Sequence, residues 1–456
     1  MTASRAMNPM SQTTMSTSKH PAASRVSFGA LAFLLAGTVA NAQDLAPKAA
    51  PQARPIILRG GTIHTVTGEP IVGGDQLFEA GRIKAVSKTP VNVDGDVDVI
   101  DATGKHVLPG FVLATSTLGL VEVESVDMTI DMTEAGSFNP EVYAAVAVNP
   151  DSWWLPVARR GGVMVAGVFP QGGVVPGRAS VMQLDGWTWE DMALVRDAGL
   201  GLSWPGDFGG RFRRASSTSN VEERIAAVGR LFDAAEAYVA AKAADGSIPT
   251  DLRYESMRGV LDGSKPVFVT LTTRAQAEAA LGWGKRRGLK MAVIGGRDAL
   301  SYVDLLKRHD VPVAITGTHR LPHRRDLSHR TTYQLPRLLE AHGVRWCISM
   351  RPRDSANARN LVYEAAACIA HGLEPDVALR AITLGAAEFL GVDGRVGSLE
   401  EGKDATVLLV DGDPFELGSV YERGWIQGRE VAMEDKQTAL YEKYREKYRQ
   451  LGRLPR

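Results

Sequence analysis

The sequence predicts an α/β fold in which a region of parallel β/α units lies between two β-rich ends of the chain. From residue 107 to residue 371, short apolar runs rich in β-branched residues alternate with longer stretches of helical periodicity. Residues 56–100 have the pattern of short strands separated by glycine turns, and a second β-rich group follows at residues 396–431. The chain has 456 residues, of which 44% are hydrophobic and 23% charged, so it can form a large core.

Seven apolar runs are predicted to be parallel strands, and five longer segments are predicted to be helices. The strands are expected at residues 107–114, 162–169, 199–204, 266–270, 290–294, 311–315 and 344–348. No eighth strand is evident, and residues 180–184 are expected to belong to an inserted hairpin. The helices are expected at residues 221–243, 274–287, 298–309, 334–342 and 356–371. Residues 435–450 carry mixed charges and three tyrosines, and predict a terminal helix that packs on the β-rich ends or on a partner.

Residues 1–42 have the pattern of a secretory signal sequence. Lys19, His20 and Arg25 precede an apolar run at residues 26–39, and Ala40-Asn41-Ala42 then provides a small-x-small cleavage pattern before Gln43. A membrane anchor is the alternative, although the run is shorter than the ~20 residues that a span needs. We therefore expect export across the inner membrane to the periplasm, and no membrane-spanning segment after cleavage.

The mature chain is close to electrically neutral. The whole sequence has 52 basic and 52 acidic residues, and only three of these, the basic Arg5, Lys19 and Arg25, lie in residues 1–42. The remaining 49 basic and 52 acidic residues give a formal charge of −3. This balance gives no bulk attraction to nucleic acid or to an anionic membrane. The two cysteines, Cys347 and Cys368, lie in apolar segments and are expected to be buried free thiols, with a disulfide between them as the alternative.

Three segments resemble the amidohydrolase superfamily, close to its imidazolonepropionase-like members. Residues 108–120 begin with Pro109-Gly110-Phe111-Val112, and they resemble the family's first barrel strand, P-G-[FL]-[IV]-D-x-H-x-H. Residues 396–414 and 425–431 are similar to the family's closing β-strands, and residues 56–65 to its opening ones, where His64 is expected to be structural. The resemblance covers nearly the whole mature chain. It implies a (β/α)8 TIM-like barrel with a small composite β-sandwich domain.

The resemblance also divides the chain into segments. We expect a signal peptide at residues 1–42, a linker at 43–55, the first part of the β-sandwich at 56–108 and the barrel at 109–395. The second part of the sandwich is expected at 396–432, and a helical tail at 433–456.

The resemblance implies a divalent metal such as zinc at the carboxyl ends of the barrel strands, where it activates water to hydrolyse a non-peptide C–N bond. The positions that match the family's metal and catalytic residues carry other residues here: Thr115, Thr117, Thr270, Gly295 and Met350. Hydroxyls, glycine and a thioether do not form a zinc site, and no carboxylate stands at these positions for magnesium or calcium. The residues therefore predict no metal and no other cofactor.

The loops after the predicted strands carry an unusual number of arginines. Residues 316–330 hold four arginines and three histidines against one acid, and Arg351 and Arg353 lie on the next loop, while Arg274 and Arg297 follow earlier strands. Guanidinium groups suit carboxylates and phosphates. The candidate ligand-binding residues are His319, Arg320, Arg351 and Arg274. The alternatives are solvated charges that pair with nearby aspartates, or a relocated metal site within residues 319–329.

Two functional hypotheses follow. The first is a degenerate hydrolase, a pseudoenzyme that binds an anionic small molecule or pairs with a catalytically intact relative or a second copy of itself. The second is an active hydrolase of a cyclic amide or similar substrate that uses a relocated or unrecognised site. An open pocket with convergent polar groups favours binding or catalysis, whereas a closed apolar barrel mouth favours a scaffold.

Overall fold

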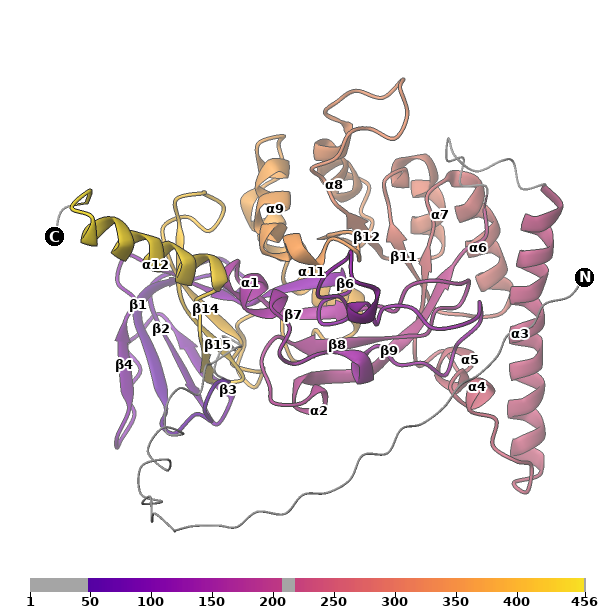
Figure 1. Ribbon diagram of the computed structural model, residues 1–456, viewed down its shortest axis with the longest axis horizontal. Coiled ribbons are helices and arrows are strands. Elements are labelled where there is room, and N and C mark those ends of the chain that lie inside the picture. The colour runs from indigo at the N-terminus through magenta and orange to yellow at the C-terminus, as the bar shows by residue number, and fades with distance from the viewer. Residues whose placement is uncertain (1–47, 207–217, 455–456) are drawn as a thin grey trace, which may run out of the picture. The chain divides into compact units, whose positions relative to one another are not determined.

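Two eight-stranded sheets and the helices around them make up the described part of the chain (Figure 1). The computed structural model describes residues 48–206 and 218–454, so the predicted signal sequence lies outside the described residues. In those two ranges, no helix has both the length and the apolar character needed to cross a membrane.

The first sheet is built from both ends of the chain. Its strands are β1 (Ile56–Ile63), β2 (Ile71–Glu79), β3 (Arg82–Ser87), β4 (Asp98–Asp101), β5 (His106–Pro109), β14 (Val407–Asp411), β15 (Val420–Ile426) and β16 (Arg429–Val431). They follow the order β16-β15-β14-β5-β1-β2-β3, with β4 paired to β1. Val407 of β14 lies opposite Pro109 of β5 in an antiparallel pair, which joins the two ends. The edge of the Trp425 ring packs on Phe78 in the core of this domain, with ring centroids 5.6 Å apart. The composite β domain is confirmed.

The second sheet is a nearly closed barrel. Its strands lie in chain order: β6 (Phe111–Ser116), β7 (Val163–Val168), β8 (Arg178–Gln183), β9 (Ala193–Ser203), β10 (Val267–Thr270), β11 (Met291–Gly295), β12 (Val313–Thr316) and β13 (Trp346–Ser349). The two edge strands meet where the backbone N–H of Thr115 donates to Ser349 Oγ at 2.9 Å. The predicted barrel fold is therefore confirmed.

The structure differs from the sequence prediction at two strands. The run at 107–114 forms two strands, β5 and β6, which separate at Gly110 and enter different sheets. A Cβ at Gly110 would lie 2.7 Å from the Met164 side chain, so only glycine fits this crossing. The predicted hairpin strand, β8, is itself a barrel strand and runs antiparallel to both neighbours. Its connections, residues 169–177 and 184–192, are shorter than the dozen or more residues that a parallel crossover needs.

Most helices lie outside the barrel sheet (Figure 1). They are α1 (Trp154–Arg160), α2 (Trp189–Met192), α3 (Thr218–Ala244), α4 (Leu252–Glu255), α5 (Arg258–Leu261), α6 (Arg274–Arg286), α7 (Val303–Arg308), α8 (Thr331–Ala341), α9 (Leu361–Ile369), α10 (Pro375–Ala381), α11 (Leu384–Leu390) and α12 (Lys436–Gln450). Four short 3₁₀ turns, η1 (Asp127–Thr129), η2 (Ala145–Ala147), η3 (Ala299–Tyr302) and η4 (Ser355–Asn360), complete the set. The predicted helices at 298–309 and 356–371 begin as η3 and η4 and continue as α7 and α9.

The barrel interior is filled with apolar side chains. The ring of Phe268 packs against Phe169 at 5.1 Å and against Phe389 of α11 at 5.4 Å between centroids. These rings belong to one buried cluster with small aliphatic side chains of the other barrel strands. The interior is therefore a packed core, and a ligand site is expected at an end of the barrel.

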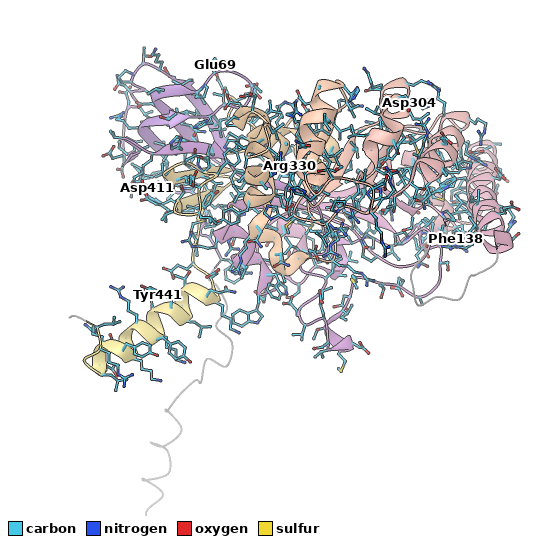
Figure 2. All side chains as sticks on the ribbon, turned by 90° about the horizontal axis from the view of Figure 1, so that it is seen from above. Glu69, Phe138, Asp304, Arg330, Asp411 and Tyr441 are labelled. Atoms are coloured by element: carbon cyan, nitrogen blue, oxygen red, sulfur yellow. The ribbon has the colours of Figure 1, made fainter. Side chains whose placement is uncertain are left out.

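The terminal helix α12 has no buried residue. The Asp435 side chain caps its first turn by accepting a hydrogen bond from the Thr438 N–H at 2.8 Å. Tyr441, Tyr444 and Tyr448 are exposed, and the helix stands away from the rest of the described chain (Figure 2). In the described structure α12 buries no residue against the β-rich ends, and packing on a partner stays a prediction.

A buried carboxylate joins the barrel to the β domain. Asp185, which follows β8 and is 1% exposed, receives a hydrogen bond from Arg429 Nη1 of β16 at 2.9 Å. Its carboxylate also lies 3.9 Å from Arg159 Nη1, a guanidinium that is itself buried. Burial lowers the pKa of Arg159, and the negative charge of Asp185 opposes that shift. Asp185 thus supplies the countercharge for a buried cation between two domains.

Replacing this carboxylate is expected to destabilise the protein strongly. Asp185→Ala should lower the free energy of unfolding by about 3–5 kcal/mol, because it leaves a buried charge without its partner. Urea denaturation followed by tryptophan fluorescence measures the change. The matched control is Glu223→Ala, which removes a solvent-exposed ion pair with Arg230 and should have a much smaller effect. Equal losses in the two variants would contradict this role of Asp185.

Candidate functional site

A cavity of about 370 Å³ lies at the carboxyl ends of the barrel strands. The last residues of four consecutive parallel strands line it: Ser203, Thr270, Gly295 and Thr316. The loops that follow β11, β12 and β13 supply all the charged residues of its wall. In barrel enzymes this end of the strands carries the active site.

The charged residues of this cavity are all arginines. Arg297 follows β11, Arg320 follows β12, and Arg351 and Arg353 follow β13. The other polar groups in the wall are hydroxyls and one amide, from Ser203, Thr270, Thr272, Thr316 and Gln171. Among the described residues, no acid lines the cavity.

Only one of the four arginines is neutralised by a neighbouring carboxylate. Arg351 makes a bidentate pair with Asp354, with Nε–Oδ2 at 2.6 Å and Nη2–Oδ1 at 2.9 Å. Within residues 48–206 and 218–454, no carboxylate oxygen lies within 4.0 Å of Arg297, Arg320 or Arg353. Arg297 instead donates from Nη2 to the Leu321 carbonyl at 2.7 Å, and Arg320 from Nη1 to the Thr316 carbonyl at 3.2 Å. The Arg297 Nε–H is buried and has no partner in the described structure.

Burial and repulsion between neighbouring arginines disfavour the charged form of two of these guanidinium groups. Burial lowers the pKa of Arg297, and the charge of Arg351 lowers it further. Burial also lowers the pKa of Arg320, with added repulsion from Arg297 and Arg351, against attraction from Asp354 and Glu364. Arginine remains protonated in proteins despite such shifts. The cavity therefore concentrates positive charge at some cost in stability, and a bound anion would relieve that repulsion.

A buried glutamate holds the loop that carries Arg320. The Glu364 carboxylate, on the inner face of α9, accepts hydrogen bonds from the backbone N–H of Thr318, from Thr318 Oγ1 at 2.6 Å and from the His319 N–H at 2.9 Å. Glu364 was not predicted to be important. Its sequence signal is an acid on an otherwise apolar helix face, with Leu361, Ala365 and Cys368.

Thr115 and Thr117 are buried and do not line the cavity. Thr115 Oγ1 donates to the Met350 carbonyl at 2.8 Å and lies 2.9 Å from Ser349 Oγ. Thr117 Oγ1 donates to the Pro352 carbonyl at 2.8 Å and lies 2.9 Å from Ser355 Oγ. Both hydroxyls are thus fully engaged with the segment after β13, and no orphaned oxygen points to a missing metal.

Gly295 cannot be exchanged for a histidine without moving the backbone. Its φ angle is +124°, which L-residues rarely adopt, and a Cβ there would lie 2.6 Å from the Leu271 carbonyl oxygen. Met350, the remaining predicted position, is buried and does not line the cavity. Among the described residues, no group of three histidine, cysteine or acidic side chains is arranged to hold a metal ion. The residues at these positions do not fit a divalent metal.

The predicted basic cluster divides in space. Arg320 and Arg351 line the cavity, and Arg297 and Arg353 join them. Arg274 lies outside on α6, where it pairs with Glu278 at 2.7 Å and Asp304 at 3.2 Å. His319 is exposed outside the cavity wall, with its ring edge towards Tyr333. His323 and Arg324 approach Asp298, at 3.4 and 3.8 Å, so part of the loop charge is paired as the alternative interpretation held.

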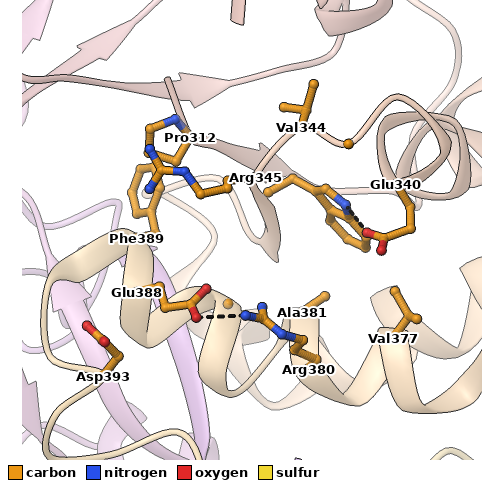
Figure 3. Close-up of a pocket in the computed structure, with 13 residues that line it drawn as sticks. Pro312, Glu340, Val344, Arg345, Val377, Arg380, Ala381, Glu388, Phe389 and Asp393 are labelled. Carbon is orange, nitrogen blue, oxygen red and sulfur yellow. Dashed lines mark hydrogen bonds and ion pairs between the residues drawn. The ribbon is translucent and has the colours of Figure 1, made fainter. Parts of the chain in front are cut away.

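The two thiols and the opposite end of the barrel offer no comparable site. Cys347 and Cys368 are free and buried, and burial raises the pKa of both thiols, that of Cys368 to about 12. A crevice of about 570 Å³ lies between the amino ends of β12 and β13 and the helices α10 and α11 (Figure 3). Several of its charged groups already have partners: Arg380 pairs with Glu388 at 2.7 Å, and Glu340 accepts a hydrogen bond from Trp346 Nε1 at 2.9 Å.

Comparisons with known proteins agree with this fold. Residues 270–439 match the family model described as "Amidohydrolase family". An amidohydrolase from Thermotoga maritima MSB8 has a similar structure, with a TM-score of 0.74 and 25% identity over 83% of this chain and 99% of that one. Molinate hydrolase shares the fold, with a TM-score of 0.51 and 17% identity over 84% of this chain and 95% of that one.

A short segment also matches a curated protein. It is 36% identical over 72 residues to amidohydrolase tasK of Hapsidospora irregularis, covering 16% of this chain and 7% of that protein. This chain therefore spans only a small part of that relative. The fold defines a barrel protein with a composite β domain. Over residues 270–439 the chain matches the amidohydrolase family, and its fold is similar to that of the amidohydrolase from Thermotoga maritima MSB8.

The residues that line the cavity predict that the protein binds little metal. Purified from cells supplied with zinc and manganese, it should contain well below one equivalent of either, as measured by inductively coupled plasma mass spectrometry, because the wall offers hydroxyls and arginines. One equivalent that is lost in His319→Ala or His323→Ala would reveal a relocated site. One equivalent that persists in those variants would show that a metal occupies the barrel mouth, and either result contradicts the prediction.

Gly295 is predicted to be required for the backbone at the end of β11. Gly295→Ala should lower the free energy of unfolding by about 1–3 kcal/mol, because alanine is strained at this φ and its methyl group meets the Leu271 carbonyl. Gly229→Ala is the control, because this glycine lies inside α3 with open space around it. That change should stabilise by about 0.5–1 kcal/mol in the same urea titration. A neutral effect of Gly295→Ala would contradict the close approach.

Proposed function

We propose that this amidohydrolase-superfamily protein binds an anionic small molecule at the carboxyl ends of its barrel strands, and that binding has replaced metal-dependent hydrolysis of a C–N bond. The observation that carries the proposal is the cavity wall, in which four arginines and several hydroxyls converge without an acid among the described residues. Charge-assisted hydrogen bonds from guanidinium groups to carboxylate or phosphate oxygens are among the strongest in proteins.

The same wall argues against hydrolysis at this site. Activation of water needs a metal, or a general base with a pKa near the working pH. The described lining contains no histidine, carboxylate, lysine, tyrosine or cysteine, so no side chain in it can accept a proton near neutral pH. The partly buried Arg297 and Arg320 favour an anion instead.

Binding can be tested with simple anions. In calorimetric titrations at pH 7.5, phenyl phosphate or phthalate should bind with a measurable Kd, and binding should weaken as salt is added, whereas neutral phenol should not bind. Arg297→Met or Arg320→Met should each weaken binding about tenfold or more, because each removes charge-assisted hydrogen bonds.

Arg274→Met is the matched control. It removes a guanidinium whose partners, Glu278 and Asp304, lie outside the cavity, and it should leave the affinity unchanged. Circular dichroism checks that each variant is folded. The absence of binding by any anion above the level of phenol, or an equal loss in Arg274→Met, would contradict the proposal.

A further inference from the structure

The charges of the cavity indicate how many negative charges its ligand carries. Asp354 neutralises Arg351 through two hydrogen bonds, so this arginine adds little unbalanced charge. Arg297, Arg320 and Arg353 have no carboxylate within 4.0 Å in the described ranges. Arg353 is exposed, so solvent and salt screen its charge, whereas Arg297 and Arg320 are half-buried. Two uncompensated, partly desolvated cations call for a ligand with two negative charges, because a monoanion would leave one of them unmatched.

The two guanidinium groups are held on the same loop. Arg320 is anchored to the Thr316 carbonyl at the end of β12, and Arg297 reaches across from β11 to the Leu321 carbonyl, which is the residue after Arg320. The Arg297 guanidinium therefore lies against the loop segment that carries Arg320, and both arginines line the same cavity. The two negative charges of the ligand must therefore lie close together, on one chemical group, and not at opposite ends of a long molecule.

The uncharged part of the wall suits a group with several oxygens. Each of the two guanidinium groups uses one N–H for its backbone anchor, and the buried Arg297 Nε–H has no partner in the described structure. The hydroxyls of Ser203, Thr270 and Thr272 line the same cavity. A carboxylate offers two oxygens and one charge, whereas a terminal phosphate offers three oxygens and nearly two charges at neutral pH.

We infer that the ligand of this site carries a terminal phosphate, as in a small organic phosphomonoester, and that Arg297 and Arg320 together bind its dianion. This inference rests on the proposed anion-binding function and specifies its ligand class. Arg351, already paired with Asp354, contributes as a weaker outer contact.

The test compares phenyl phosphate with phenyl sulfate, which have nearly the same shape but carry about two charges and one charge at pH 7.5. The unmodified chain should bind phenyl phosphate at least tenfold more tightly in calorimetry at constant ionic strength. At pH 5 the phosphate loses its second charge, since its second pKa is about 6, while the arginines stay protonated. The phosphate-to-sulfate ratio should then fall to about threefold or less.

Variants assign the effect to the two arginines. Arg297→Met and Arg320→Met should each reduce the phosphate-to-sulfate ratio, whereas Arg274→Met should leave it unchanged, because Arg274 lies outside the cavity. Equal affinity for the two esters at pH 7.5, or tighter binding of the dicarboxylate succinate than of phenyl phosphate, would overturn the phosphate inference but leave anion binding intact. No binding by any of these anions would overturn the proposed function itself.

Discussion

The closure of the barrel between β6 and β13 is the constraint on which the rest of the site depends. Thr115 joins the two strands through Ser349 Oγ and the Met350 carbonyl, and Thr117 does the same with Ser355 and Pro352. Thr115 and Thr117 stand at the positions that match the superfamily's first pair of metal ligands. Each of the two hydroxyls is buried and hydrogen-bonded, so neither is available to a ligand in the cavity, which other residues line.

The mouth of the barrel carries an excess of positive charge. Among the described residues no acid lines the cavity, and Arg297 and Arg320 donate hydrogen bonds to backbone carbonyls and not to carboxylates. The Phe169, Phe268 and Phe389 rings pack against one another in the buried apolar core of the barrel. The fold thus places an arginine-lined cavity at the end of an apolar barrel core. This arrangement suits the binding of an anion better than it suits proton transfer.

The sequence predicted the strands and helices well because apolar runs and helical periodicity are local signals. It could not predict the direction of β8, which depends on the length of its connections and on the strands beside it. The site was predicted in part. Arg274 and Arg297 both follow barrel strands, yet Arg274 begins α6 and pairs with Asp304, whereas Arg297 precedes η3 and lines the cavity. Spacing alone cannot separate these two outcomes.

The most direct test of an anion-binding mouth is to locate a heavy tetrahedral dianion in crystals of the protein. Tungstate soaked at low millimolar concentration would be found by its anomalous scattering. We expect the highest peak within hydrogen-bond distance of the guanidinium groups of Arg297 and Arg320. A highest peak beside Arg274 or another surface cation, with none between Arg297 and Arg320, would contradict it.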